Sequence, residues 1–142
     1  MYNDLEIDEV LLLIENKIYI HSSNNIVYIE LLEDSLTDGD NIIMHKVLDN
    51  FYNNCKKNNT IFYIVYDFSQ LSITSSTNLI YNASIYQDHF DKHITFLRTN
   101  LKYLYIIIQN YTLRESLNNI LDLYKPEIQP KIIKDIKDIE FY

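Results

Sequence analysis

The run at residues 61–66, with the sequence IFYIVY, constrains the fold of this chain more than any other stretch. It is apolar throughout and rich in β-branched and aromatic side chains, so it predicts a β-strand. Because polar residues do not alternate with apolar ones, we expect both faces of this strand to be covered, as in the parallel sheets of α/β proteins. The run ends at Asp67, where a polar turn begins. Since open α/β sheets bind ligands at the carboxyl ends of their strands, this turn is the first place to look for function.

Several shorter β-rich runs accompany this central strand. Residues 17–21 and 26–32 flank the polar turn 22–25 and predict an antiparallel hairpin. Residues 10–14 form a further apolar run, either a separate strand or the beginning of a bent one. Residues 101–109 and 131–134 complete the expected strands, the last of them a short strand at an edge of the sheet.

Helices are predicted where apolar residues recur at intervals of three and four. They cover residues 40–57, 79–97 and 112–124, with a short final helix at 136–142. Asp38 or Asp40 is the expected N-cap of the first of these helices. Thr112 is the expected N-cap of the third, because Glu115 follows at the spacing of a capping box.

The order of these elements predicts an α/β fold with one open mixed sheet of four to five strands. The hairpin lies at one side, the later strands are parallel because crossovers are right-handed, and about four helices cover the sheet. A chain of 142 residues fits a single domain. Residues 1–16 are an N-terminal extension or an extra strand of that domain.

Charge and composition narrow the choice of partners. The net charge of −8 argues against nucleic acid and anionic membranes, which bind clustered Lys and Arg, and leaves a protein partner or a second copy of the chain. No apolar run approaches the ~20 residues of a membrane helix.

The lone Cys55 and the acidic residues 1–9 favour a cytoplasmic location without a signal peptide. One Gly and 13 Tyr suggest an A+T-rich genome, as in some large DNA viruses and unicellular eukaryotes. For a viral protein, the host cytoplasm or the virion is the expected location.

The central strand and its turn resemble a known family. Residues 67–71 read DFSQL, and residues 75–79 read SSTNL where a helix is expected to open. This pattern is similar to the STAS family, which includes bacterial anti-sigma-factor antagonists and sulfate-transporter tails. In that family Asp-Leu-Ser-Gly-Val follows the strand and Asp-Ser-Ser-Gly-Leu opens the helix. The resemblance runs from about residue 17 to the C-terminus and includes a strand–helix–strand ending at residues 104–136.

By spacing, Ser76 falls on the serine that the STAS family phosphorylates, whereas Ser75 replaces the family's Asp and Asn78 replaces its Gly. The resemblance implies a non-enzymatic protein–protein interaction module, with no cofactor, metal or small-molecule substrate. Its partner-binding residues would be Asp67, Ser69, Ser75, Ser76, Thr77 and Asn78, and phosphorylation of Ser76 or Ser75 would regulate it.

Physical chemistry is compatible with such a switch. Free N–H groups and the dipole favour negative charge at a helix N-terminus, and a phosphate there changes the charge presented to a partner. The residues by themselves favour a simpler interpretation, in which Ser75 or Ser76 is only the N-cap of the helix, worth about 1 kcal/mol. Asp67 has a structural interpretation too, as an acceptor for N–H groups of the following turn.

Two further functions stay open. One is a structural or assembly protein, such as a viral component, that uses this fold as a dimer or oligomer; the Tyr-rich composition motivates it. The other is a small enzyme or ligand-binding domain that uses Asp67, Ser69 and Ser76. No base–nucleophile pair supports the enzyme.

The sequence offers one pair of possible metal ligands, but a metal site is not expected. His89 and His93 lie four residues apart on a predicted helix, a spacing that can chelate an ion, but no third ligand is evident beyond Asp88, Asp91 or His45. Because neighbouring residues carry the apolar stripe, both histidines are expected to be exposed or at its boundary. The acidic residues 33–40 lack EF-hand spacing, and Cys55 is expected to pack in the core.

Overall fold

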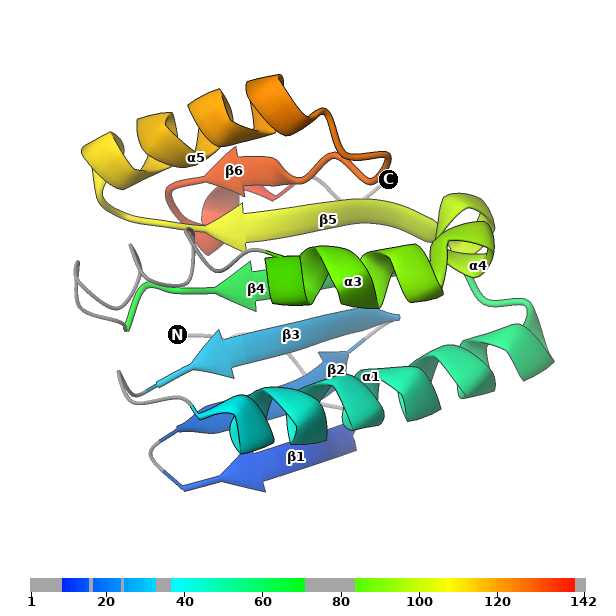
Figure 1. Ribbon diagram of the computed structural model, residues 1–142. Coiled ribbons are helices and arrows are strands. Elements are labelled where there is room, and N and C mark those ends of the chain that lie inside the picture. Colours follow the sequence, from blue (N-terminus) through cyan, green and yellow to red (C-terminus); the bar gives the residue numbers. More distant parts are fainter. Residues whose placement is uncertain (1–8, 16, 24, 33–36, 71–83, 140–142) are drawn as a thin grey trace.

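The computed structural model describes residues 9–15, 17–23, 25–32, 37–70 and 84–139, and in this part of the chain one mixed sheet is the centre of the fold (Figure 1). The strands are β1 (Glu9–Ile14), β2 (Ile18–Ser23), β3 (Ile26–Leu31), β4 (Phe62–Asp67), β5 (Leu101–Ile107) and β6 (Lys131–Ile133), and they lie side by side in this order. Strands β1 to β3 are antiparallel neighbours, whereas β3 to β6 are parallel. The predicted α/β class and mixed sheet are confirmed. Within the described residues the sheet has six strands rather than four to five, because residues 9–14 form a strand of their own.

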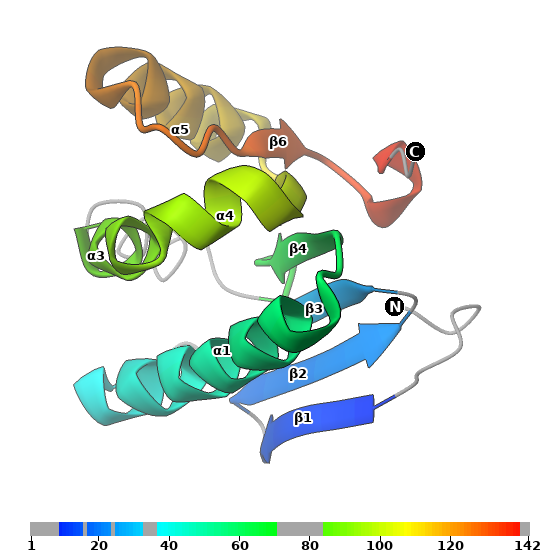
Figure 2. The same cartoon turned by 90° about the vertical axis from the view of Figure 1, so that its right-hand side faces the viewer.

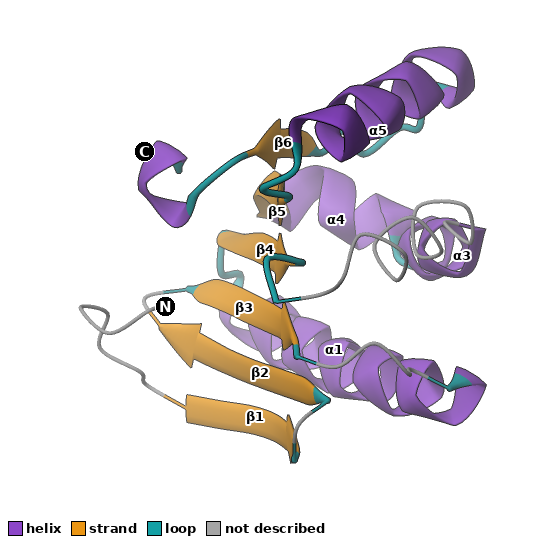
Figure 3. Ribbon diagram, turned by 90° about the vertical axis from the view of Figure 1, so that its left-hand side faces the viewer, coloured by secondary structure: helices purple, strands orange, loops and turns teal. Residues whose placement is uncertain are grey.

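The helices are α1 (Asp38–Asn58), α3 (Ser84–Lys92), α4 (Ile94–Asn100) and α5 (Tyr111–Tyr124), followed by the short 3-10 turn η1 (Ile136–Asp138). Figures 2 and 3 show the α-helices of the described ranges on one face of the sheet and η1 on the other. The predicted helical cover therefore applies to one face. Among the helices of the described ranges, none combines the length and the apolar character needed to cross a bilayer.

Helix α1 begins with a capping box at Thr37, whereas the sequence predicted its N-cap at Asp38 or Asp40. The Thr37 hydroxyl accepts the N–H of Asp40 (3.1 Å), and Oδ2 of Asp40 accepts the N–H of Thr37 (2.9 Å). Asp40 is thus the third residue of the helix, and neither it nor Asp38 is the N-cap. The helix ends at Asn58, and the left-handed conformation of the C-cap Asn59 (φ 50°) turns the chain toward β4.

The later helices differ from the prediction in three places. The stripe expected at residues 79–97 is divided at His93, whose N–H bonds to the carbonyl of Phe90 three residues before it; residues 79–83 lie outside the described ranges. The cap of α5 is Asn110, which accepts the N–H of Leu113 (3.0 Å), so the prediction of Thr112 was wrong. The final helix is a single 3-10 turn within the part of the chain described.

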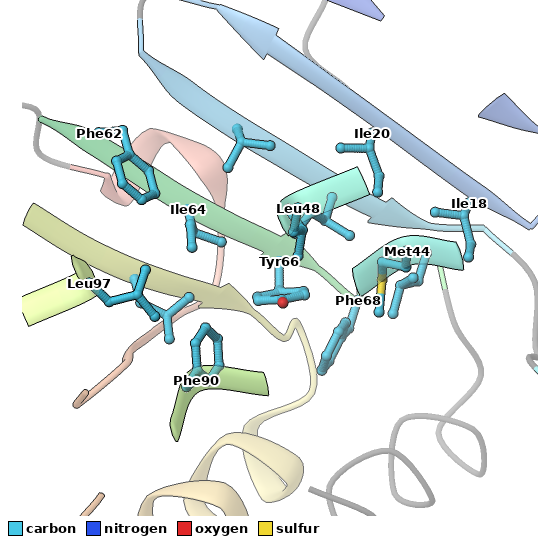
Figure 4. Close-up of a cluster of buried hydrophobic side chains, with 14 of the residues drawn as sticks. Ile18, Ile20, Met44, Leu48, Phe62, Ile64, Tyr66, Phe68, Phe90 and Leu97 are labelled. Atoms are coloured by element: carbon cyan, nitrogen blue, oxygen red, sulfur yellow. The ribbon is translucent and has the colours of Figure 1, made fainter. Parts of the chain in front are cut away.

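Strand β4 is covered on both faces, as its uniform apolar sequence predicted. Phe62, Ile64 and Tyr66 point toward the helices and join the main core. Figure 4 shows part of this core, where side chains of β2, β4, α1, α3 and α4 converge. On the other face, Val65 packs in a smaller cluster with residues of β3, β5 and the C-terminal turn: Ile26, Tyr28, Tyr105, Ile107 and Ile139.

Candidate functional site

The predicted turn begins with a buried carboxylate. Asp67 is the last residue of β4 and is 1% exposed. Its Oδ1 accepts the backbone N–H of Ser69 (2.8 Å), which confirms that this side chain holds the turn. Between these two residues, the backbone N–H of Phe68 donates to the carbonyl of Ile107 in β5 (3.0 Å). These two hydrogen bonds fix the position of the chain where it leaves the sheet after β4, beside the parallel strand β5.

Further buried ionisable groups lie near Asp67 on the sheet face opposite the helices. Glu30 of β3 is in register with Asp67, so their side chains share a face. Nε2 of His21, on β2, lies 3.5 Å from a carboxylate oxygen of Glu30. The imidazole of His21 also stacks on the ring of Tyr28, with centroids 5.0 Å apart. Three adjacent strands thus contribute one buried ionisable side chain each.

The remaining residues of the predicted binding face are Ser75, Ser76, Thr77 and Asn78, and they lie outside the described residues. Ser69 is half-buried beside Asp67. The structure brings these two predicted residues together and leaves the other four without a structural description.

A second polar cluster lies in the helical layer. His45, Asp49 and Tyr52 are spaced by four and three residues, so they share one face of α1. His89 lies on α3, and His93 lies four residues later at the junction with α4. The fold places these five residues against one another, although Asp49 and His93 are 44 positions apart in the chain.

Asp49 is the charged centre of this cluster. Its Oδ1 accepts a 2.5 Å hydrogen bond from Nε2 of His93 and lies 4.0 Å from Nδ1 of His89. Its Oδ2 pairs with the ammonium of Lys92 at 3.2 Å. One potential ligand atom each from Asp49, His89 and His93 lies within 4.8 Å of the other two.

Aromatic contacts fix the imidazole rings. The ring of His45 stacks on that of His89, with centroids 4.4 Å apart and planes at 18°. The Tyr52 hydroxyl forms a 2.9 Å hydrogen bond with Nε2 of His89, and its ring meets that of His93 edge-on at 4.9 Å. Each side chain of the cluster is therefore held by at least one neighbour.

Burial and hydrogen bonds together set the charge states of His89, His45 and Asp49. Desolvation, followed by the nearby His45 and His93, lowers the pKa of His89 to about 3, and desolvation also lowers the pKa of His45. For Asp49, burial opposes ionisation, but hydrogen bonds from His93 and Lys92 outweigh it and lower the carboxyl pKa. At neutral pH the cluster thus combines a neutral imidazole at His89 with a carboxylate, which are donors that a metal ion accepts.

The sequence did not predict this cluster. His89 was expected to be exposed or at a boundary and is 6% exposed, so that expectation was wrong; His93 is half-buried. Asp49 and Tyr52 were missed because they lie on another helix. A signal was present in the spacing of His45, Asp49 and Tyr52 along one helical face, although a solvated face shows the same spacing.

Comparison of the chain with family models, with curated proteins and with solved structures found no match. The STAS resemblance therefore depends on the sequence pattern.

Proposed function

We propose that this chain is a non-enzymatic protein–protein interaction module of the STAS type. Its binding face is the turn that begins at Asp67, with Ser69, Ser75, Ser76, Thr77 and Asn78. Phosphorylation of Ser76 or Ser75 regulates it. The observation that carries the proposal is the hydrogen bond from the Ser69 N–H to the buried Asp67 carboxylate, which fixes the beginning of the turn at the carboxyl end of a central parallel strand.

Of the four histidines, His21 shares a sheet face with Asp67, and its imidazole lies against Glu30 and Tyr28. His45, His89 and His93 lie in the helical layer on the other face. A histidine that acted as a general base at the Asp67 turn would therefore have to be His21.

The partner follows from charge. With a net charge of −8, the module favours a basic or neutral protein surface, and a cytoplasmic partner suits its single cysteine. A phosphate on Ser76 would add about two negative charges at pH 7, enough to change a contact made by the turn.

Affinity capture from the native source tests the proposal, with the wild-type chain, Ser76→Ala and Ser76→Asp as baits. Thr112→Asp is the matched control, because Thr112 is exposed in the first turn of α5 and receives the same charge. We expect a partner that Ser76→Asp weakens more than Ser76→Ala, while Thr112→Asp leaves it bound. Equal capture by all baits would refute the switch. Phosphopeptide mapping of the native protein then shows whether Ser76 or Ser75 carries phosphate.

Self-assembly is the second candidate, and an exposed apolar edge favours it. Strand β1 is at one end of the described sheet, and its residues Val10 and Leu13 are exposed. A strand at the edge of a sheet pairs readily with another strand. The tyrosines contribute less than the composition suggested, because Tyr111 is the one exposed tyrosine among those whose side-chain burial the structure describes. Light scattering after size exclusion should then detect a dimer or larger species that Leu13→Lys dissociates; a monomer at high concentration would exclude this candidate.

A further inference from the structure

The cluster around Asp49 has the features of an ion-binding site rather than of ordinary helix packing. Two helical segments that are far apart in sequence bring a carboxylate and two imidazoles to one point. The three residues range from half-buried to buried, so their donor atoms are partly protected from water. The aromatic neighbours Tyr52 and His45 hold the imidazoles in place.

We propose that Asp49, His89 and His93 bind one divalent transition-metal ion of the Zn²⁺ type, which links α1 to the junction between α3 and α4. Two imidazoles and one carboxylate form a donor set that Zn²⁺ accepts, and they leave coordination positions for water. The ion would join two parts of the helical layer, and this site is independent of the binding face proposed at Asp67.

The distances require only small movements. Metal–ligand bonds of about 2.1 Å in tetrahedral geometry place the ligand atoms about 3.4 Å apart. The Asp49–His93 pair, at 2.5 Å, would open to admit the ion, and the Asp49–His89 pair, at 4.0 Å, would close. In the metal-free form Nε2 of His93 donates its hydrogen to Oδ1 of Asp49, and the ion would take the place of that hydrogen.

The surrounding groups orient the ligands. When Nε2–H of His89 donates to the Tyr52 oxygen, Nδ1 keeps its lone pair, and this is the nitrogen on the side of Asp49. The ammonium of Lys92 occupies Oδ2 of Asp49 and leaves Oδ1 for the ion. Such outer contacts commonly change metal affinity by about 10- to 100-fold.

Calorimetric titration of tag-free protein with Zn²⁺ tests the proposal. The variants are Asp49→Asn and His93→Gln, which keep the size of each side chain closely enough for folding to be checked by circular dichroism. Asp88→Asn is the matched control, because Asp88 is exposed on α3 and its substitution removes the same charge. Titration with Co²⁺ provides a second readout, because its visible absorption reports the ligand geometry.

We expect one Zn²⁺ per chain, and affinity at least about tenfold weaker in Asp49→Asn and His93→Gln, as for the loss of a ligand, with Asp88→Asn unchanged. Co²⁺ should develop absorption bands with the same stoichiometry in the wild-type protein and in Asp88→Asn. Absence of Zn²⁺ binding, or equal affinity in all four proteins, would overturn the proposal. The cluster would then be a hydrogen-bonded contact between helices.

Discussion

Replacement of Tyr52 by Phe tests whether the helical cluster is a cooperating unit. Tyr52 is fully buried on α1, and its hydroxyl forms a 2.9 Å hydrogen bond with Nε2 of the buried His89. Burial raises the pKa of Tyr52, so the hydroxyl is protonated across the accessible pH range. The substitution keeps the ring, with its packing on Phe62 and Phe96, and removes one oxygen.

The loss in the free energy of unfolding is set by the groups that remain after the Tyr52 oxygen is removed. Nε2 of His89 stays buried without this partner, and a buried polar atom in that state costs about 1–3 kcal/mol. The cavity left by a single oxygen is small, so the cavity contributes little. We therefore expect Tyr52→Phe to lower the free energy of unfolding by about 1–3 kcal/mol, a large fraction of the ~5–15 kcal/mol typical of a domain.

Equilibrium unfolding in urea measures this change, with Tyr111→Phe as the control. Tyr111 is 67% exposed, so its substitution should change the free energy of unfolding by less than about 0.5 kcal/mol. If the slope of the free energy of unfolding against urea concentration is the same for both variants, they unfold between comparable states. If Tyr52→Phe were as stable as Tyr111→Phe, the hydrogen bond between Tyr52 and His89 would contribute nothing to stability. The side chains of the cluster would then not cooperate in holding the helices together.

Three further outcomes are expected. Leu48 is fully buried on α1, so Leu48→Ala should cost about 2–5 kcal/mol in urea unfolding, whereas Leu123→Ala at an exposed site should cost less than about 0.5 kcal/mol. Burial raises the pKa of the Cys55 thiol to about 11, so iodoacetamide should label the native protein slowly and the urea-unfolded protein rapidly; rapid native labelling would contradict this. The hydrogen bond from the Thr37 N–H lowers the pKa of Asp40, so Asp40 contributes stability above its unfolded pKa that is lost as the pH falls through the folded value. Asp40→Asn should reduce this acid dependence of the urea midpoint, and an unchanged dependence would count against the capping box.

The sequence predicted those parts of the fold that depend on local patterns. The uniform apolar run at residues 61–66 indicated a strand buried on both faces, and the structure confirms it because Ile64 and Val65 enter two different cores. Helix caps were predicted less well. Thr37, Asp38 and Asp40 are all suitable N-cap residues within four positions, and the backbone geometry decides between them.

In the candidate sites, too, contacts between residues near in sequence could be predicted, whereas contacts between distant segments could not. The role of Asp67 was predictable because its hydrogen-bond partner, Ser69, is two residues away. Asp49 was not identified as the third member of the histidine cluster, because the way α1 packs against α3 decides that contact. A sequence pattern does not contain the register between two helices that are joined through a strand. The buried state of His89 depends on the same packing.

Coordination of an ion by His89 and His93 is tested most directly by nuclear magnetic resonance of the imidazole nitrogens in ¹⁵N-labelled, tag-free protein. With one equivalent of Zn²⁺, Nδ1 of His89 and Nε2 of His93 should move to the chemical shifts of metal-bound nitrogens, while the nitrogens of His21, on the opposite face of the sheet, should not move. Unchanged shifts at both histidines would contradict a metal centre in the helical layer.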